Sequence, residues 1–383
     1  MTAFRTKHLL FTIVGLAAAA IIIIIWIAAV RIDRTPAAVS RSAAITNPDV
    51  SAGTVLGDTP APAFTLVDQN GRPTSLRDFR GKVVVLAFVD SHCTTVCPLM
   101  TESMTQALRL LGPAASQVQL LGIDANPLAT RVADVAAYTR AHHMQGSWRF
   151  LTGSLPELTH VWRAYHVYVA AVHNDIDHQP VIVLIDGHGR ERTLYFTQMS
   201  YEGVLQQAEL LAEGISRLLP SHPSVHDIVP LEYIPALEPT DVVRLPGLGK
   251  RAESVVLGKG HPHLLLFFAG WLAEDSDVHS GLAALDGYAT LARQHGWPTP
   301  AAINELATEG SDTVARQAIA HLAARIRTPI VEDAQGRLGD GYGVQDLPWF
   351  VLTSSSGRIL WHHDGWLSSQ RLAAKVGELL HAG

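Results

Sequence analysis

The two cysteines of this chain are its residues best suited to chemistry, because they are its only thiols. Cys93 and Cys97 lie in the segment SHCTTVCP, directly after the apolar, strand-like run of residues 83–89. Pro98 begins a helical pattern, so the thiols are predicted at a strand-to-helix turn. Unpaired N–H groups and the positive dipole end at a helix start lower the pKa of a thiol. They favour the thiolate, which is both a nucleophile and a soft-metal ligand.

The spacing of Cys93 and Cys97 leaves three uses open. The three intervening residues give one more residue of slack than the two of a thioredoxin motif, and this suits two thiolates on one metal ion. Thiol-disulfide exchange is the second use, with Cys93 as the nucleophile and Cys97 as the resolving thiol. The third, an inert structural disulfide, would close a tiny loop, and short loops gain least from a crosslink.

Composition excludes one class of partner. The chain has 383 residues, a net charge of −6, a pI near 6.3 and no run of Lys or Arg. Because nucleic-acid binding needs a basic surface, we expect no nucleic-acid partner. The length exceeds that of one ordinary core and predicts two domains.

The N-terminal segment is predicted to anchor the protein in a membrane. Residues 8–30 carry no formal charge and include five consecutive isoleucines, which is enough to cross a bilayer as a helix. A signal peptide has a shorter apolar region, so we expect a retained single-pass anchor. Residues 31–62, rich in Ala, Ser, Thr and Pro, are predicted to be a flexible tether. The near absence of cysteine favours globular domains on the extracytoplasmic side of the cell membrane.

Residues 63–219 form a first block in which strands alternate with helices. Strands are predicted at 83–89, 118–124 and 181–186, with 192–196 as the second arm of a hairpin. Helical patterns cover 98–111, 130–142, 155–165 and 201–218. This alternation predicts a layered α/β sheet with helices on both faces.

A second block repeats this order of elements. Residues 220–240 hold five prolines and are predicted to be a linker, and the second block covers 241–383. Its strands are predicted at 263–269, 300–304, 328–331, 349–353 and 358–362, and its helices at 282–294, 312–324 and 368–380. The shared order indicates an internal duplication of one fold.

An ordered set of motifs spans nearly the whole first block. They are FTLVDQNG at 64–71, LRDFRGK at 76–82, HCTTVCP at 92–98, GID at 122–124 with Pro127, WRFLTGS at 148–154, and Asp177-His178 six residues before LID at 184–186. In these motifs the block resembles the Sco (SenC) proteins. These are membrane-anchored copper proteins with a thioredoxin fold that help to build the dinuclear copper centre of cytochrome c oxidase.

The Sco resemblance implies that Cys93, Cys97 and His178 bind one copper ion. The chemistry agrees, because thiolates select Cu(I) and imidazole ligates copper as either Cu(I) or Cu(II). Asp177 could orient the ring of His178 as an acceptor, although adjacent residues in an extended segment point apart. Asp124 matches a family aspartate near the site, and capping of the segment that follows its strand is an equal alternative.

Three other features near the predicted site have a competing interpretation. His173 is the rival for the third ligand, although its position is more typical of a solvated loop histidine. Met100 and Met104 lie one helical turn apart, as a copper-binding pair would, but this pattern is more typical of core packing. Pro180 falls at the cis-proline position of a thioredoxin fold, where a cis bond would shape the pocket.

The second block contains LPGLGK at 245–250, HLLLFFAGW at 263–271, YGVQDLP at 342–348 and SGRI at 356–359. In these segments it resembles a TlpA-type thioredoxin domain, with Pro348 at the cis-proline position. Leu272-Ala273-Glu274-Asp275 replaces that family's CxxC, so the domain is predicted to be redox-inactive. The expected fold class is therefore α/β, with two tandem thioredoxin-like domains behind an N-terminal transmembrane helix.

Three roles remain open for the second domain. It could be a partner-binding module that uses the groove near Trp271 and Pro348, or a structural cap on the first domain. It could also carry acid chemistry on Glu274 and Asp275, although two carboxylates at a helix start are usually dipole partners.

The predicted function is copper delivery to, or maintenance of, the dinuclear copper site of cytochrome c oxidase during assembly. The expected partners are the copper-site subunit of that oxidase and a copper donor that the sequence does not identify. One alternative is an extracytoplasmic thiol-disulfide oxidoreductase that uses Cys93 and Cys97, and another is a scaffold protein. His178 separates the first two, because disulfide exchange needs no third metal ligand.

Overall fold

The computed structural model describes residues 50–173, 175–225, 235–248, 253–274, 277–309 and 312–381. The predicted membrane helix, residues 8–30, and most of the predicted tether lie outside these ranges. No helix within the described ranges is both long and apolar enough to span a membrane. The described residues belong to one compact unit, in which a first α/β lobe, within residues 50–219, precedes a second, within residues 241–381.

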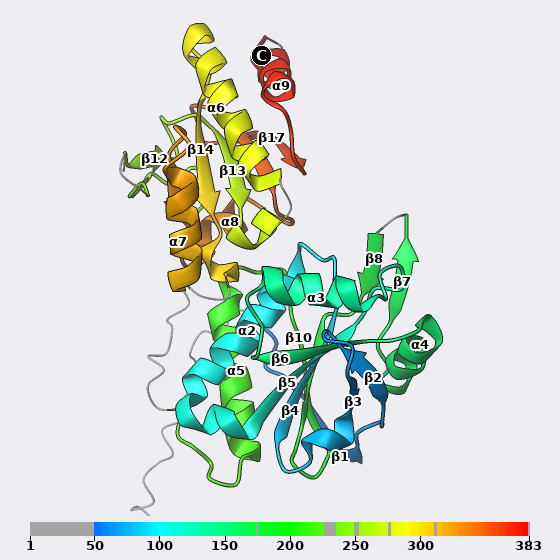
Figure 1. The fold of residues 1–383 in the computed structure, drawn as a ribbon. Coiled ribbons are helices and arrows are strands. Elements are labelled where there is room, and N and C mark those ends of the chain that lie inside the picture. Colours follow the sequence, from blue (N-terminus) through cyan, green and yellow to red (C-terminus); the bar gives the residue numbers. More distant parts are fainter. Residues whose placement is uncertain are drawn as a thin grey trace, which may run out of the picture. The chain divides into compact units, whose positions relative to one another are not determined.

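The first lobe is built on one mixed sheet with the strand order β1-β10-β9-β4-β5-β6-β2-β3 (Figure 1). Its strands are β1 (Thr54–Pro60), β2 (Thr65–Asp68), β3 (Pro73–Ser75), β4 (Val83–Val89), β5 (Val118–Asp124), β6 (Trp148–Thr152), β9 (Val181–Ile185) and β10 (Arg190–Phe196). A separate hairpin consists of β7 (Val169–Val172) and β8 (Asp175–His178). The helices are α2 (Val96–Leu111), α3 (Val132–Ala141), α4 (Leu155–Ala164) and α5 (Gly203–Leu218), with 3-10 turns at Leu76–Phe79 and Gly112–Gln117.

Strand β4 lies at the centre of the first lobe and is buried along its whole length. Val85 and Ala87 belong to the core that α2, α3 and α5 form on one face of the sheet. Leu86 and Phe88 belong to the core that α4 forms on the other face. Because side chains alternate across a strand, one continuous apolar run supplies both cores.

The strand directions confirm the α/β, thioredoxin-like fold predicted for the first lobe. β4 runs parallel to β5 and antiparallel to β9, and β9 is antiparallel to β10. The crossovers between the parallel strands are helical, as parallel pairing requires.

One predicted boundary is wrong. Residues 54–60, which we assigned to the tether, form strand β1 at the edge of the sheet and pair with β10 from Thr54–Leu194 to Pro60–Arg190. All of β1 is exposed except for Leu56, which is half-buried. An edge strand of this kind carries no apolar run, so its sequence resembles that of a linker.

The second lobe repeats the core topology of the first. Its strands are β11 (Val243–Leu245), β12 (Val255–Leu257), β13 (His263–Phe268), β14 (Thr299–Asn304), β15 (Ile330–Glu332), β16 (Trp349–Thr353) and β17 (Ile359–Asp364). Its helices are α6 (Asp277–His295), α7 (Asp312–Ala323), α8 (Arg337–Gly341) and α9 (Ser369–His381), with 3-10 turns at Gly270–Glu274 and Leu306–Thr308. The main sheet has the order β15-β14-β13-β16-β17. β13 is parallel to β14 and antiparallel to β16, and β16 is antiparallel to β17, as in the first lobe.

The two prolines predicted at cis-proline positions differ in the structure. The Leu347–Pro348 bond is cis, as predicted. It is the only cis bond within the described ranges, so Pro180 is not a cis-proline. Pro180 lies between β8 and β9, and its carbonyl oxygen accepts a hydrogen bond from the Thr197 N–H.

Replacing Leu86 with alanine tests how far the first lobe depends on β4. Leu86 is fully buried, so we expect Leu86→Ala to lower the free energy of unfolding by about 2–5 kcal/mol. The matched control is Leu128→Ala, because Leu128 is 68% exposed and its loss should change stability by less than about 0.5 kcal/mol. Urea unfolding of the full chain, followed by circular dichroism, measures both. Equal shifts in the two variants would contradict the central role of β4.

Candidate metal centre

Strand β4 leads into the loop that carries the cysteines. The loop turns at Asp90, whose carbonyl oxygen accepts a hydrogen bond from the Cys93 N–H at 3.2 Å. Helix α2 then begins at Val96, and its N-cap residue Thr95 makes no side-chain capping bond. Instead, the Cys97 N–H donates to the Cys93 sulfur at 3.4 Å. The Cys93 sulfur therefore satisfies one of the N–H groups that a helix start leaves unpaired.

His178 reaches the cysteines from a hairpin far along the chain. It is the last residue of β8 and pairs with Val169 of β7. Its Nε2 atom lies 3.5 Å from the Cys97 sulfur, and both cysteines are free thiols. The structure thus brings together the three side chains that the Sco resemblance implied as ligands.

The two thiols differ in acidity. A hydrogen bond from the Cys97 side chain lowers the pKa of Cys93 against the opposing effect of burial, and the Thr95 hydroxyl at 3.2 Å acts in the same direction. Burial raises the pKa of Cys97 well above its ordinary value. The first proton therefore leaves Cys93, while Cys97 remains a thiol that donates to the Cys93 thiolate.

His178 is held in the neutral form that binds metals. Burial lowers the pKa of His178, while the negative charge of Asp90 acts in the opposite direction. Its Nδ1 atom is buried and makes no hydrogen bond of normal geometry. Two sulfurs and one imidazole nitrogen are a donor set that fits Cu(I). Within the described ranges, no group of three or more His, Cys, Asp and Glu side chains is arranged closely enough to hold a metal ion.

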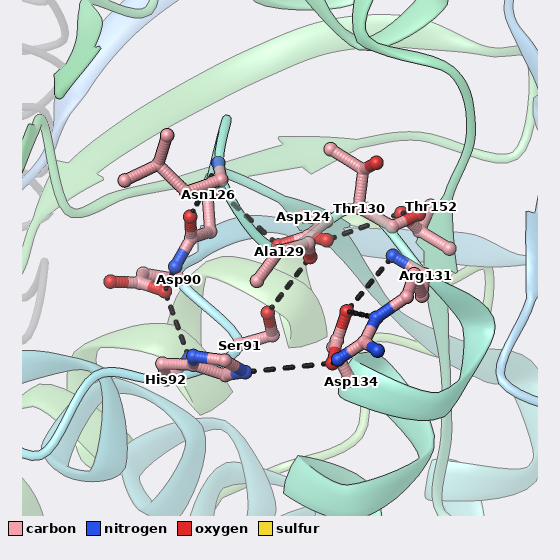
Figure 2. A network of polar contacts seen from close by, with 11 residues as sticks. Asp90, Ser91, His92, Asp124, Asn126, Ala129, Thr130, Arg131, Asp134 and Thr152 are labelled. Carbon is pink, nitrogen blue, oxygen red and sulfur yellow. Dashed lines mark hydrogen bonds and ion pairs between the residues drawn. The ribbon is translucent and has the colours of Figure 1, made fainter.

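Figure 2 shows a polar network that holds the start of the cysteine loop. The Asp90 carboxylate accepts hydrogen bonds from Asn126 Nδ2 at 2.6 Å and from the His92 N–H at 2.8 Å. The His92 ring lies 3.6 Å from Asp134, which Arg131 holds by an ion pair at 2.7 Å. The network therefore ties residues 90–92 to the segment after β5 and to the first turn of α3.

Asp124 lies deeper in the same network, at the end of β5. It is fully buried, and burial raises its pKa to about 8. The carboxyl group accepts from the Asn126 N–H at 3.2 Å and lies 3.2 Å from the Thr152 hydroxyl, which is also 2.9 Å from the Thr130 carbonyl oxygen. Thr152 has one proton for these two oxygens, so a protonated Asp124 satisfies both contacts. Asp124 thus caps the segment after β5 and is linked to the cysteine loop through Asn126 and Asp90.

The remaining predicted residues lie outside this centre. Asp177 is exposed while His178 is half-buried, as alternation along β8 requires, and Asp177 acts on the ring through its charge, which opposes the lowering of the His178 pKa. The ring-orienting contact predicted for Asp177 is therefore absent from the described part of the chain. His173 is exposed in the hairpin turn. Met100 and Met104 are buried in the core beneath α2, which favours the packing interpretation.

Sequence reasoning missed Asp90 as a residue of the centre. Asp90 was assigned only as the end of a strand, but its charge acts on both thiols and on His178. Its position directly after a buried strand and three residues before Cys93 could have indicated that its carboxylate lies close to the thiols. Asn126, which holds Asp90, gave no signal in the sequence.

Replacing Cys97 with alanine tests the source of the Cys93 acidity. Without the hydrogen bond from Cys97, we expect the apparent pKa of Cys93 to rise. It is read from the pH dependence of iodoacetamide alkylation of the reduced, metal-free chain, with the modified residue assigned by peptide mass spectrometry. Thr95→Val is the comparison and should give a smaller rise in the same direction. An unchanged Cys93 titration in Cys97→Ala would contradict the assignment.

Asp124→Asn tests the buried carboxyl group. The folded chain keeps a proton on Asp124 that the unfolded chain loses above a pH of about 4, so stability should fall as the pH rises from about 4 to about 8. Asparagine preserves the neutral shape, so Asp124→Asn should make urea stability less dependent on pH in this range. Asp58→Asn, at a side chain 67% exposed, is the control and should keep the wild-type slope. Equal slopes in wild type and Asp124→Asn would show that Asp124 is ionised in the fold.

Part of the chain is similar to known proteins. Residues 56–213 match the SCO1/SenC family model. The chain is 33% identical over 170 residues to the mitochondrial SCO2 homolog of Mus musculus, an alignment that covers 42% of this chain and 63% of that protein. It is 32% identical over 170 residues to the Bos taurus homolog, covering 42% and 60%. The chain thus spans about three-fifths of the length of these curated relatives.

Solved structures are also similar to this region. Copper-bound ScoI of Bradyrhizobium japonicum is 26% identical, and the match covers 42% of this chain and 100% of that one, with a TM-score of 0.34. A SCO1/SenC family lipoprotein of Bacillus anthracis is 26% identical, with coverage of 42% and 98% and a TM-score of 0.36. The region that matches the SCO1/SenC family model, residues 56–213, contains Cys93, Cys97 and His178.

Proposed function

We propose that the first lobe binds one copper ion through Cys93, Cys97 and His178. The observation that carries this proposal is that the three side chains lie close together. His178 Nε2 lies 3.5 Å from the Cys97 sulfur, and the Cys97 N–H donates a hydrogen bond to the Cys93 sulfur. The match of residues 56–213 to the SCO1/SenC family model supports it.

Copper is then the cargo of the protein. We propose that the chain delivers copper to, or maintains, the dinuclear copper site of cytochrome c oxidase during assembly, as the Sco resemblance implies. Cys93 is the partly exposed thiol, so the ligand of an acceptor would enter beside Cys93 while the buried Cys97 still holds the ion. Exchange one ligand at a time would avoid a free ion.

The predicted placement of the protein fits this role. The apolar segment 8–30 would anchor the chain, and the globular domains would lie on the extracytoplasmic side of the cell membrane. The expected partner there is the copper-site subunit of the oxidase. We further propose that the second lobe is a TlpA-like thioredoxin domain without its CxxC, on the grounds of its sequence motifs and repeated topology.

Disulfide reduction is a second candidate function, and the acidic Cys93 thiol favours it. The Cys93 thiolate would attack a target disulfide, form a mixed disulfide and release one target thiolate. Cys97, after losing its proton, would displace the second target thiolate and close the Cys93–Cys97 disulfide. Two electrons would pass from the chain to the target, so this activity would need an external reductant to restore the dithiol.

A Cu(I) competition titration of the reduced full chain tests the proposed copper site. We expect one Cu(I) per chain with tight binding, and loss of that binding in Cys93→Ser/Cys97→Ser, because serine oxygens are poor ligands for Cu(I). Wild-type binding no tighter than in the double variant would exclude the copper site and leave disulfide exchange as the function.

Variants of His178 separate the two functions. His178→Ala should weaken Cu(I) binding by at least about tenfold, because the ion loses one of three ligands. The rate of disulfide exchange should stay within about twofold of wild type, because this chemistry needs only the thiols. His173→Ala, in the same hairpin, is the matched control and should change neither. Comparable losses of both activities in His178→Ala would overturn this separation of roles.

A further inference from the structure

Specific polar contacts join the second lobe to the first. The Asp340 carboxylate of the second lobe accepts hydrogen bonds from the N–H groups of Tyr201 at 2.8 Å and Glu202 at 3.0 Å, and from the Ser200 hydroxyl at 3.2 Å. These residues lie at the start of α5, which has no side-chain cap of its own. Asp340 therefore supplies from the second lobe the anionic cap that this first-lobe helix lacks.

Trp271 lies where the second lobe meets the helices around the cysteines. It belongs to the 3-10 turn Gly270–Glu274, just before the position of the missing CxxC, and its side chain is buried. Its indole N–H donates to the Thr308 hydroxyl at 3.0 Å, which fixes the ring within the second lobe. The turn of Trp271 lies beside α3, and the turn Leu306–Thr308 lies beside α2. Leu99 of α2 shares one buried core cluster with Trp271, so the contact reaches the helix that carries Cys97.

The Trp271 ring stacks on two rings at the end of α3. Its centroid lies 4.7 Å from that of His142, the C-cap residue of α3. The His142 ring lies 4.1 Å from that of Tyr138, one helical turn earlier. Burial lowers the pKa of His142 to about 3, so these are contacts between uncharged rings. The groove that we predicted for an external partner is therefore covered, in part, by the chain itself.

The Tyr138 hydroxyl extends this stack to the first turn of α2. It lies 3.3 Å from the hydroxyl of Thr101. The Thr101 hydroxyl donates its own proton to the carbonyl oxygens of Cys97 and Pro98, each at 3.1 Å, so Tyr138 is the donor in its bond to Thr101. Both side chains are buried, so water does not readily replace a lost partner. Printed contacts therefore run without a break from Trp271 to the backbone of Cys97.

We propose that Trp271 is a positioning residue for the metal centre. Through His142 and Tyr138, it holds the start of α2 in the conformation that buries Cys97. The polar network of Figure 2 fixes the loop before α2, and this stack fixes the first turn of the helix. Cys97 is fully buried, so the start of α2 must move before Cys97 can react or release a ligand. Resting on the proposed copper function, the stack would set how fast Cys97 gives up its copper.

Alkylation of Cys97 reports movement of the start of α2 without any metal. In a reduced, metal-free full chain with Cys93→Ser, iodoacetamide can react only with Cys97. Tyr138→Phe removes only the hydroxyl, and His142→Ala removes the ring between Trp271 and Tyr138. At one fixed pH, each should raise the alkylation rate about fivefold over the Cys93→Ser parent, the effect of one lost hydrogen bond or ring contact. Trp271→Ala should be at least as fast, and if it did not fold, the other two variants would still decide the proposal.

A double-mutant cycle tests whether the three rings act along one path. In the Tyr138→Phe chain, the addition of His142→Ala should change the alkylation rate by less than about twofold, because the bond through which His142 acts is already gone. Independent effects would multiply to about 25-fold. That outcome would show that the two residues only stabilise the fold separately, and it would overturn the proposal.

Two matched variants separate the stack from a general loss of packing. His142→Phe keeps an aromatic ring and loses no charge, so it should stay within about twofold of the parent rate. Trp297→Ala removes a second Trp–His stack of the second lobe, in which the Trp297 ring lies 4.6 Å from that of His295, and it should have no effect. Unchanged rates in Tyr138→Phe and His142→Ala, or equal acceleration in His142→Phe or Trp297→Ala, would contradict the positioning role.

Copper measurements distinguish this proposal from the copper function itself. In chains with Cys93 restored, Tyr138→Phe should release Cu(I) to a chelator about fivefold faster than wild type, with the same one-to-one stoichiometry. If wild type bound no copper, the proposed function would fail, but the alkylation result would still decide the role of Trp271. If copper bound tightly and Cys97 alkylation were insensitive to Tyr138→Phe and His142→Ala, only the positioning role would fail.

Discussion

The hydrogen bond from the Cys97 N–H to the Cys93 sulfur depends on where β4 ends. Because β4 is buried on both faces, its position in the sheet cannot shift without exposing one of two cores. The loop that follows must therefore start at Asp90 and enter α2 within a few residues. Because this path is short, Cys93 lies just before the start of α2 and Cys97 lies in its first turn. The pKa of Cys93 is lowered there and the pKa of Cys97 is raised.

The ionisation of Cys93, Cys97 and His178 is controlled by burial and by neighbouring side chains. A hydrogen bond from the Cys97 side chain lowers the pKa of Cys93, whereas burial raises the pKa of Cys97 and lowers the pKa of His178. The Asp90 charge nearby opposes a second thiolate. A cation would remove this opposition, since it lets both thiols ionise and pairs with the charge that forms. If these residues bound a cation, its binding would therefore be coupled to release of a proton from Cys97.

The second lobe shows how a duplicated fold can be used within one chain. Its sequence predicts a groove without thiols, and the structure packs Trp271, next to that groove, on His142 of the first lobe. Asp340 adds a helix cap that α5 cannot supply itself. These contacts support the structural-cap interpretation of the second lobe over an open binding module. Asp275, one of the two acids considered for chemistry there, lies outside the described residues.

The sequence by itself determined the elements with strong local signals. The runs at β4, β5 and β9 and the helices α2 and α5 were predicted nearly to the residue, because continuous apolar runs and helical periodicity are local. Only the tertiary structure determined the features that depend on contacts between segments far apart in the sequence. β1 is mostly exposed, so only its pairing with β10 makes it a strand. Likewise, the β7–β8 pairing brings His178 to Cys97, and lobe packing brings Asp340 to the start of α5, contacts that no local pattern encodes.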